Sequence, residues 1–167
     1  MKVVSTLVEA HIFRQAADDI EFLLIKRADD DELFPGVWQM VTGSIKENEK
    51  AFETSWREIQ EETGLIPLKF WIAPNVNSFY NQAKDVINFI PVFAALVNSN
   101  SQVVLSNEHS DYKWVDKEEA KKMLIWKGQR NSVDTIHDYF TKEISSLNLI
   151  EIKIDDINYI RQTKNKD

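Results

Sequence analysis

The chain has 167 residues, a net charge of −7 and no cysteine. This length fits one domain that can bury a core without disulfides or a structural metal. The lack of cysteine excludes disulfides, thiolate metal sites and a cysteine nucleophile. The acidic balance argues against a non-specific nucleic-acid binder, which needs a basic surface. A zinc site would have to use His11, His109 and His137, which form no close-spaced ligand motif.

The first thirteen residues are apolar, but they are too short for a membrane-spanning helix and lack the pattern of a secretory leader. We therefore expect a cytoplasmic protein without a membrane partner. Two strands are predicted at 3–13 and 21–26, separated by a polar turn at 14–19. Lys26 and Arg27 end the second strand, where they could be solvent-exposed or directed at a phosphate. Arg27 has the better bidentate geometry for a phosphate.

A short strand is predicted at 37–41, after a turn at 35–36. Trp38, within this strand, could pack in the core or form a wall of a substrate pocket. Gly43 follows in the loop before a helix. A residue without a Cβ allows a close approach or an unusual backbone conformation at that point.

A helix is predicted at 50–63, because this stretch contains no glycine or proline and is rich in strong helix formers. Asn48 is the predicted N-cap, and Gly64 is placed to end the helix in a left-handed conformation. The stripe expected to face the core has the spacing i, i+4, i+7 and i+11 and consists of Phe52, Trp56, Ile59 and Thr63.

Three carboxylates share a second face of this helix, since Glu58, Glu61 and Glu62 stand at i, i+3 and i+4. Like charges at this spacing cost roughly 0.2–0.5 kcal/mol per pair in an isolated helix, so a compensating cation is expected. Mg²⁺ and Mn²⁺ prefer oxygen ligands, and Mg²⁺ typically combines one or two carboxylates with waters and substrate phosphates. The alternative interpretation is a solvated acidic surface.

The stretch 43–65 resembles the signature of the Nudix hydrolases, G-x5-E-x7-R-E-U-x-E-E-x-G-U, in which U is aliphatic. Every specified position is filled, by Gly43, Glu49, Arg57, Glu58, Ile59, Glu61, Glu62, Gly64 and Leu65. The resemblance implies an α/β/α sandwich with a mixed β-sheet between helices. It also implies hydrolysis of a diphosphate linkage by water with Mg²⁺, or with Mn²⁺ as a substitute.

The resemblance further implies roles for individual side chains. The metal ligands it implies are the carboxylates of Glu58, Glu62 and, directly or through water, Glu61, together with the carbonyl of Gly43. Arg57 is expected to orient a catalytic glutamate. Glu49 is expected to act from the loop or from the start of the helix.

Glu108 lies outside this stretch, in a polar loop at 106–109, and is a candidate metal ligand or general base. In this family a carboxylate from outside the signature often completes the site. Either Glu61 or Glu108 could accept the proton of the attacking water. The neighbouring His109 is a predicted loop histidine, and such a residue is more often held by a local hydrogen bond than used in catalysis.

The middle of the chain predicts β-rich segments at 66–80 and 85–97, joined by a turn at 80–82. Pro91 should lie at a sheet edge or a bulge, because it cannot donate to a ladder. A further short strand is predicted at 103–105.

The last third predicts a strand at 112–115, a helix at 117–124 capped by Asp116, and a helix at 130–143. The side chains expected to face inward from the second helix are Val133, Ile136, His137, Tyr139 and Phe140. Alternating residues at 149–156 predict a strand or an arm.

Three other segments, at 38–45, 108–116 and 126–136, are similar to the bacterial branch that contains dihydroneopterin triphosphate pyrophosphatase and dATP pyrophosphohydrolases. This similarity implies a triphosphate substrate and pyrophosphate as the leaving group. The pocket candidates that it implies by position are Arg27, Trp38, Lys127, Arg130 and Asn131. Each could instead be a surface charge or part of the core.

Several alternatives remain open. The chain could be a broad-specificity nucleotide or sugar-nucleotide pyrophosphatase, a non-catalytic nucleotide sensor of the same fold, or an interaction module with a solubilising acidic face. We expect a catalytic domain at 1–144 and a C-terminal extension at 145–167 that packs on it or extends it. Family members are often dimers, so a homodimer is possible.

Overall fold

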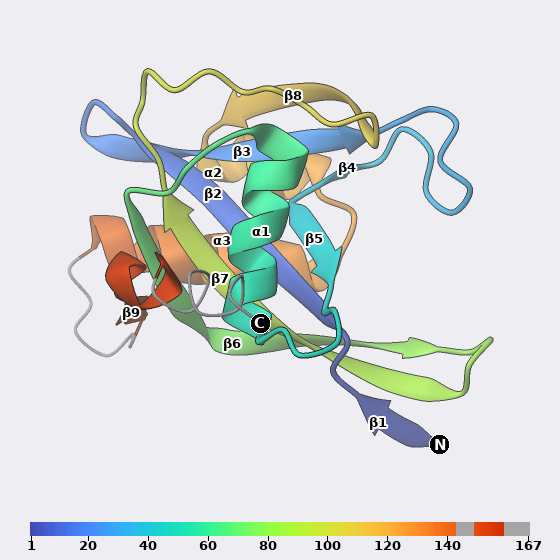
Figure 1. Cartoon of the computed structure of the whole chain (residues 1–167). Helices are drawn as coiled ribbons and strands as arrows, with labels where there is room; N and C mark the ends of the chain where they lie inside the picture. The colour runs from blue at the N-terminus through green and yellow to red at the C-terminus, as the bar shows by residue number, and fades with distance from the viewer. Residues whose placement is uncertain (143–148, 159–167) are drawn as a thin grey trace.

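A mixed β-sheet forms the centre of this computed structural model, which describes residues 1–142 and 149–158 (Figure 1). Its strands are β1 (Lys2–Val4), β2 (Leu7–Ala16), β3 (Asp19–Arg27), β4 (Trp38–Gln39), β5 (Val41–Ser44), β6 (Lys69–Asn81), β7 (Val86–Leu96), β8 (His109–Val115) and β9 (Ile150–Ile152). The main path has the order β4-β3-β2-β7-β6-β9, with β1 paired to β7, β5 to β2 and β8 to β3. β1 and β2 run parallel to β7, and the other pairs are antiparallel.

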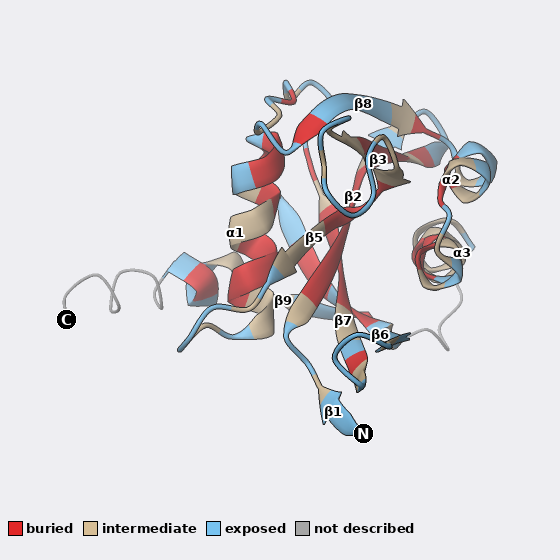
Figure 2. Cartoon of the chain, turned by 90° about the vertical axis from the view of Figure 1, so that its right-hand side faces the viewer, coloured by how far each residue is buried: buried red, intermediate tan, exposed pale blue. Residues whose placement is uncertain are grey.

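Helices cover both faces of this sheet, as the α/β/α prediction requires. Figure 2 shows α1 (Ala51–Thr63) on one side and α2 (Lys117–Met123) with α3 (Lys127–Thr141) on the other. Because both faces are covered, β3 is an apolar run rather than an alternating one. Leu23 and Ile25 pack under α1, while Phe22 and Leu24 pack under α2 and α3.

Helix α1 matches the predicted range to within one residue, but its predicted N-cap is wrong. Asn48 has a φ of 63° and belongs to the preceding turn. The cap is Lys50, whose extended backbone places its N–H 2.7 Å from the carboxylate of Glu53. Gly64 ends the helix in a left-handed conformation with a φ of 68°, as predicted.

Two predicted strands are each split in the structure because the chain changes its pairing partner. The stretch at 3–13 becomes β1, which pairs with β7, and β2, which has β3, β5 and β7 as neighbours. The stretch at 37–41 becomes β4 beside β3 and β5 beside β2, with Met40 between them. The polar turn before β3 is also shorter than predicted, since β2 continues to Ala16.

The predicted strand at 103–105 is wrong. The N–H groups of Val104 and Ser106 donate to the carbonyls of Thr63 and Glu62, at 2.9 and 3.1 Å. These carbonyls belong to the last turn of α1, where helix geometry leaves acceptors without a partner. The segment therefore caps a helix instead of joining the sheet.

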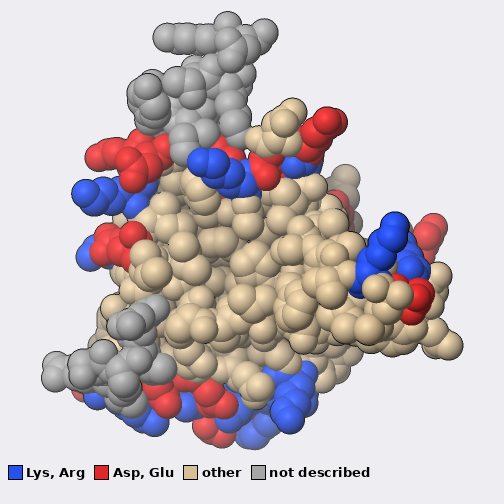
Figure 3. Space-filling model, turned by 90° about the horizontal axis from the view of Figure 1, so that it is seen from below, with Lys and Arg blue, Asp and Glu red and all other residues tan. Residues whose placement is uncertain are grey.

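The β6–β7 hairpin extends further than predicted, since β6 continues to Asn81 and the turn lies at 82–85 rather than 80–82. Pro91 lies opposite a register shift between Ile72 and Val76 of β6, which agrees with the predicted bulge. Seen from below in Figure 3, the middle of this side of the molecule is uncharged and charged side chains lie toward its rim.

The C-terminal elements differ in part from the prediction. Helix α3 begins at Lys127 rather than at 130, and the last residue of the predicted 130–143 helix lies outside the described part. Within 149–156 only β9 is a strand, and a helical turn at 154–158 follows it. Ile157 in this turn is fully buried in the core under α1. The rest of the expected extension, 145–148 and 159–167, lies outside the described residues, among which no helix is long and apolar enough to cross a membrane.

Candidate active site

Gly43, near the end of β5, lies directly against Glu58 on α1. A Cβ at Gly43 would lie 2.1 Å from the Cγ of Glu58 and 2.4 Å from its Oε1. Only glycine therefore allows this carboxylate to reach the β5 backbone. The structure thus brings together the first and the central residues of the predicted metal site.

Arg57 ties three carboxylates of this site together. Its Nε and Nη2 donate to the two carboxylate oxygens of Glu49 at 2.8 and 2.9 Å, a bidentate pair. Its Nη1 donates to Glu58 at 2.7 Å and to Glu61 at 2.8 Å. A longer bond of 3.3 Å runs from Nη2 to the carbonyl of Ser44. Arg57 therefore holds Glu49 and Glu58 in place, and it supplies part of the positive charge that the glutamate face requires.

The pKa values of Glu49 and Glu58, which both bond to Arg57, shift in opposite directions. The hydrogen bonds from Arg57 lower the pKa of Glu49 to about 2. Burial raises the pKa of Glu58, and its bond to Arg57 offsets this only in part. Arg57 thus favours the ionised form of Glu49, whereas burial opposes the ionisation of Glu58.

Glu62, one turn further along α1, is the most buried carboxylate of the site, with 5% of its surface exposed. The Nε2 of His109 lies 3.1 Å from its Oε2, although neither atom makes a well-aligned hydrogen bond. Burial raises the pKa of Glu62 to about 7, and the nearby histidine lowers it by less. A buried carboxylate oxygen without a hydrogen bond requires a positive partner.

The ligand atoms of Glu62, Glu108 and His109 lie within 4.8 Å of one another. Glu108 is exposed in the turn before β8, while His109 begins that strand and is buried. Oxygen donors with one imidazole suit Mg²⁺ or Mn²⁺, Mn²⁺ being the more tolerant of nitrogen. Glu62, Glu108 and His109 therefore fit a divalent cation.

The predicted pocket residues near the sheet are already engaged. Arg27 pairs with Asp31 and donates from Nη1 to the side-chain oxygen of Gln39 at 3.3 Å, while its buried Nε has no partner. Trp38 is half-buried beside the core under α3, and the ammonium of Lys113 lies 5.3 Å from its ring centroid. Arg27 is nevertheless the register partner of His109, which places its backbone beside the carboxylate cluster.

The pocket candidates on α3 lie on the opposite face of the sheet from α1. Lys127 and Asn131 are exposed one turn apart. Arg130 donates to the carbonyls of Leu124 and Ile125 at 2.8 and 2.7 Å. These bonds connect α2 to α3 and give Arg130 a structural role.

A second polar cluster was missed by sequence reasoning. Glu9 and His11 are buried on β2, with Oε1 of Glu9 2.6 Å from Nε2 of His11. Asn77 of β6 donates to the same oxygen at 3.0 Å and to the hydroxyl of Ser132 on α3 at 3.2 Å. The sequence does indicate this cluster. Glu9 and His11 are polar residues two positions apart in the apolar stretch VEAHIF, and side chains two apart on a strand lie on one face.

The chain matches the family model described as NUDIX domain over residues 7–136. Over 109 residues it is 31% identical to nucleoside triphosphatase NudI of Escherichia coli, and the alignment covers 61% of this chain and 77% of that protein.

Two solved structures show the same fold. A NUDIX hydrolase structure from Listeria monocytogenes has a TM-score of 0.71 at 26% identity and covers 84% of this chain and 97% of that one. The Escherichia coli dihydroneopterin triphosphate pyrophosphohydrolase has a TM-score of 0.65 at 22% identity and covers 81% and 99%. At that identity the second similarity concerns the fold alone.

Proposed function

Because this chain belongs to the Nudix family and is a Nudix pyrophosphohydrolase, we propose that it releases pyrophosphate from a nucleoside triphosphate-like substrate with Mg²⁺. Dihydroneopterin triphosphate and the deoxynucleoside triphosphates are the proposed substrates. The observation that carries this proposal is the pair of α1 carboxylates, the half-buried Glu58 against Gly43 and the buried Glu62 beside His109. The cysteine-free composition supports a cytoplasmic location as part of the proposal.

The proposed reaction is a displacement at the α-phosphorus. A water oxygen forms a bond to phosphorus, the bond to the α,β-bridging oxygen breaks, and pyrophosphate leaves as a nucleotide monophosphate-type product forms. A divalent ion bound by Glu58 and Glu62 would neutralise phosphate charge and make the water more acidic. The proton of the water passes to a carboxylate of the chain.

Two carboxylates are candidates for this base. Glu61 is exposed and accepts a hydrogen bond of 2.8 Å from Arg57. Glu108 is exposed and adjacent to the buried Glu62. Arg57 acts as a positioning residue in this scheme, because it holds Glu49 and Glu58 rather than substrate.

The test is a hydrolysis panel with Mg²⁺ that includes dihydroneopterin triphosphate, dNTPs, NTPs, dinucleoside polyphosphates, NADH and ADP-ribose, with phosphate and pyrophosphate both measured. Glu62→Gln and EDTA should abolish turnover. Glu47→Gln, an exposed change in the loop before α1, is the matched control and should keep it.

Pyrophosphate released from one triphosphate much faster than from the others supports the proposal and identifies the substrate. Turnover of a sugar nucleotide instead would replace the triphosphate proposal with the broad-specificity alternative. Metal-dependent binding of a panel compound without turnover would favour a sensor. To separate the two candidate bases, Glu61→Gln and Glu108→Gln are compared in their pH–rate profiles, because loss of the base removes the limb that reports its ionisation.

A further inference from the structure

A cavity of about 300 Å³ lies between the start of β2, the end of β5 and the β6–β7 hairpin. Ser44 connects it to the metal site: this residue lines the cavity, and its carbonyl accepts the hydrogen bond from Arg57. Gly43, the residue against which Glu58 packs, is its chain neighbour. Leu7 pairs with Ser44 and Val8 with Gly43, so the cavity lies on the sheet face opposite α1. A molecule that occupies both places would therefore cross the edge of the sheet at Ser44 of β5, which pairs with β2.

The lining of the cavity suits an uncharged planar group. Leu7 and Phe79 supply apolar surface, and Asn81 and Asn88 supply amides that can both donate and accept hydrogen bonds. Lys84 is the one charged residue among the described lining residues. One ammonium group is too little positive charge to hold a triphosphate, which needs several cations or a metal. The volume is at the lower end of the range typical of small-molecule sites, about 300–1,000 Å³.

The strand registers place further hydrogen-bonding groups on the same side of the sheet. Side chains two residues apart on a strand share a face. Leu7 is therefore on the face of Glu9 in β2, and Phe79 is on the face of Asn77 in β6. The bond of 3.0 Å between Asn77 and Glu9 confirms that these two faces coincide. Beyond the cavity this face carries the buried carboxylate of Glu9, which can accept hydrogen bonds from the N–H groups of a heterocycle.

We propose that this cavity binds the heterocyclic end of the substrate, a purine- or pterin-like ring, while the phosphates reach past Ser44 to the carboxylates of α1. This inference rests on the proposed function and assigns the part of the substrate that the metal site does not hold. Phe79 stacks on the ring, and the amides of Asn81 and Asn88 bind its polar edge.

The hairpin itself provides a matched pair of variants. Phe79 is 43% exposed and Phe89 is 42% exposed. Phe79 pairs with Asn88, whereas Phe89 pairs with Ser78, so the two rings lie on opposite faces of the hairpin. Phe79→Ala removes a ring from the cavity, and Phe89→Ala removes a comparable ring from outside it. Val86→Trp fills the cavity without removing a polar group.

The kinetic test uses dATP and dihydroneopterin triphosphate as substrates and inorganic tripolyphosphate, which has no ring, as a competitive inhibitor. Phe79→Ala should raise KM about 10-fold for the preferred substrate, since one ring stack is worth roughly this factor, with kcat nearly unchanged. Val86→Trp should raise KM at least as much. Phe89→Ala should match the wild type, and the inhibition constant of tripolyphosphate should be the same in all four proteins.

Equal effects of Phe79→Ala and Phe89→Ala, or a parallel weakening of tripolyphosphate, would overturn the assignment. A binding experiment separates this inference from the proposed function. Neopterin and deoxyguanosine are titrated in EDTA while backbone amide shifts are followed by NMR. Shifts at Phe79, Asn81 and Asn88 support the cavity even if no hydrolysis occurs. Shifts confined to other residues, in a protein that hydrolyses triphosphates, reject the cavity and leave the function intact.

Discussion

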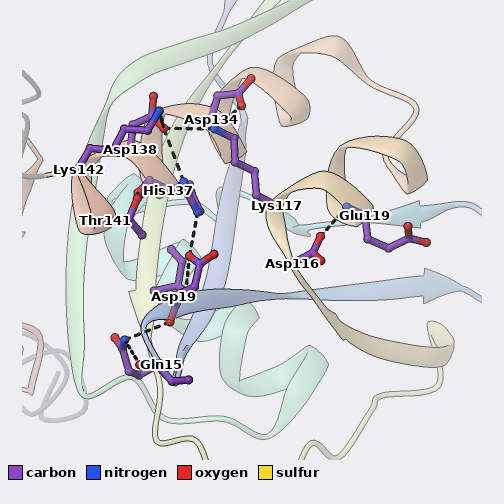
Figure 4. A network of polar contacts seen from close by, with 12 residues as sticks. Gln15, Asp19, Asp116, Lys117, Glu119, Asp134, His137, Asp138, Thr141 and Lys142 are labelled. Carbon is purple, nitrogen blue, oxygen red and sulfur yellow. Dashed lines mark hydrogen bonds and ion pairs between the residues drawn. The ribbon is translucent and has the colours of Figure 1, made fainter.

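Two networks of charged side chains lie on opposite faces of the sheet, and they differ in how their charges balance. On the α1 side one guanidinium, Arg57, bonds three carboxylates, and the buried Glu62 adds a fourth. On the other side, Asp134 and Asp138 are matched by the lysines Lys117, Lys121 and Lys142. Figure 4 shows Lys117 and Lys142 beside these aspartates.

This difference in charge balance distinguishes the two networks. In the α2–α3 network each aspartate has a lysine partner: Lys117 and Lys121 join α2 to α3, and Lys142 pairs with Asp138 at the end of α3. The α1 network has more negative charge than the described chain neutralises, and burial raises the pKa of Glu58 and Glu62 instead of lowering it. An uncompensated carboxylate cluster is costly in the free protein and becomes favourable when a cation binds.

The largest expected effect comes from removing a carboxylate of the α1 network. Glu58→Gln and Glu62→Gln should each lower kcat/KM by more than about 100-fold, since even residues that only support metal ligands cost 10- to 100-fold. The metal-free variants should be as stable as the wild type or more stable, because a buried charge is removed. Thermal unfolding checks this: Mg²⁺ should raise the Tm of the wild type but not of the variants. A large loss of stability in EDTA would show that the cluster is structural.

The next effect concerns the arginine that organises these carboxylates. Arg57→Lys keeps the charge but loses the bidentate contact with Glu49 and the simultaneous bonds to Glu58 and Glu61. We expect kcat to fall about 10- to 100-fold, with KM changed little. Lys117→Arg in the other network is the control and should leave both constants unchanged. Full activity in Arg57→Lys would mean that charge alone, and not geometry, is required.

A pair of glycine variants separates stability from activity. Gly43→Ala forces Glu58 away from β5 and should destabilise by about 1–3 kcal/mol. Gly64→Ala forces a Cβ into a left-handed conformation and should cost about 1–2 kcal/mol. Only Gly43→Ala should also lower kcat, because only this change displaces Glu58, the proposed metal ligand that packs against residue 43. Urea unfolding and initial rates measured on the same preparations would distinguish the two; equal loss of kcat would count against the placement of Glu58.

The smallest effect is expected in the α2–α3 network, where the loss of a salt bridge should change how the stability of the fold depends on acidic pH. The hydrogen bond from Lys142 is the main reason that the pKa of Asp138 is lowered to about 2 from its ordinary 3.8. A lowered carboxyl pKa stabilises the fold above pH 3.8, and this contribution is lost as the pH falls toward 2. Asp138→Asn should cost no more than about 1 kcal/mol at pH 7, since the pair is partly exposed.

Chemical unfolding at several pH values checks this expectation. The difference between the wild type and Asp138→Asn should shrink between pH 4 and pH 2 and leave activity at pH 7 unchanged. A constant difference across this range would assign the effect to packing.

Local chain geometry was sufficient to predict the centre of the site. Helix α1 needs only its own residues for its range, its left-handed end at Gly64 and the relative positions of Glu58, Glu61 and Glu62. These features depend on residues three or four positions apart, which are neighbours on the surface of a helix. The mixed sheet between helices was likewise implied by the family resemblance. The N-cap was wrongly assigned to Asn48 because the backbone conformation decides which residue caps a helix. Residue type alone does not show this conformation.

Only the tertiary structure decided which distant residues meet. His109 reaches Glu62 because β8 pairs with β3, and the N–H groups at 103–106 cap α1 because its last carbonyls lack partners. The cavity exists because the β6–β7 hairpin extends past β2 and β5. Contacts of this kind join residues tens of positions apart and depend on strand register, which periodicity within one segment does not specify. The sequence by itself therefore determined the carboxylate chemistry, and the fold decided which groups surround it.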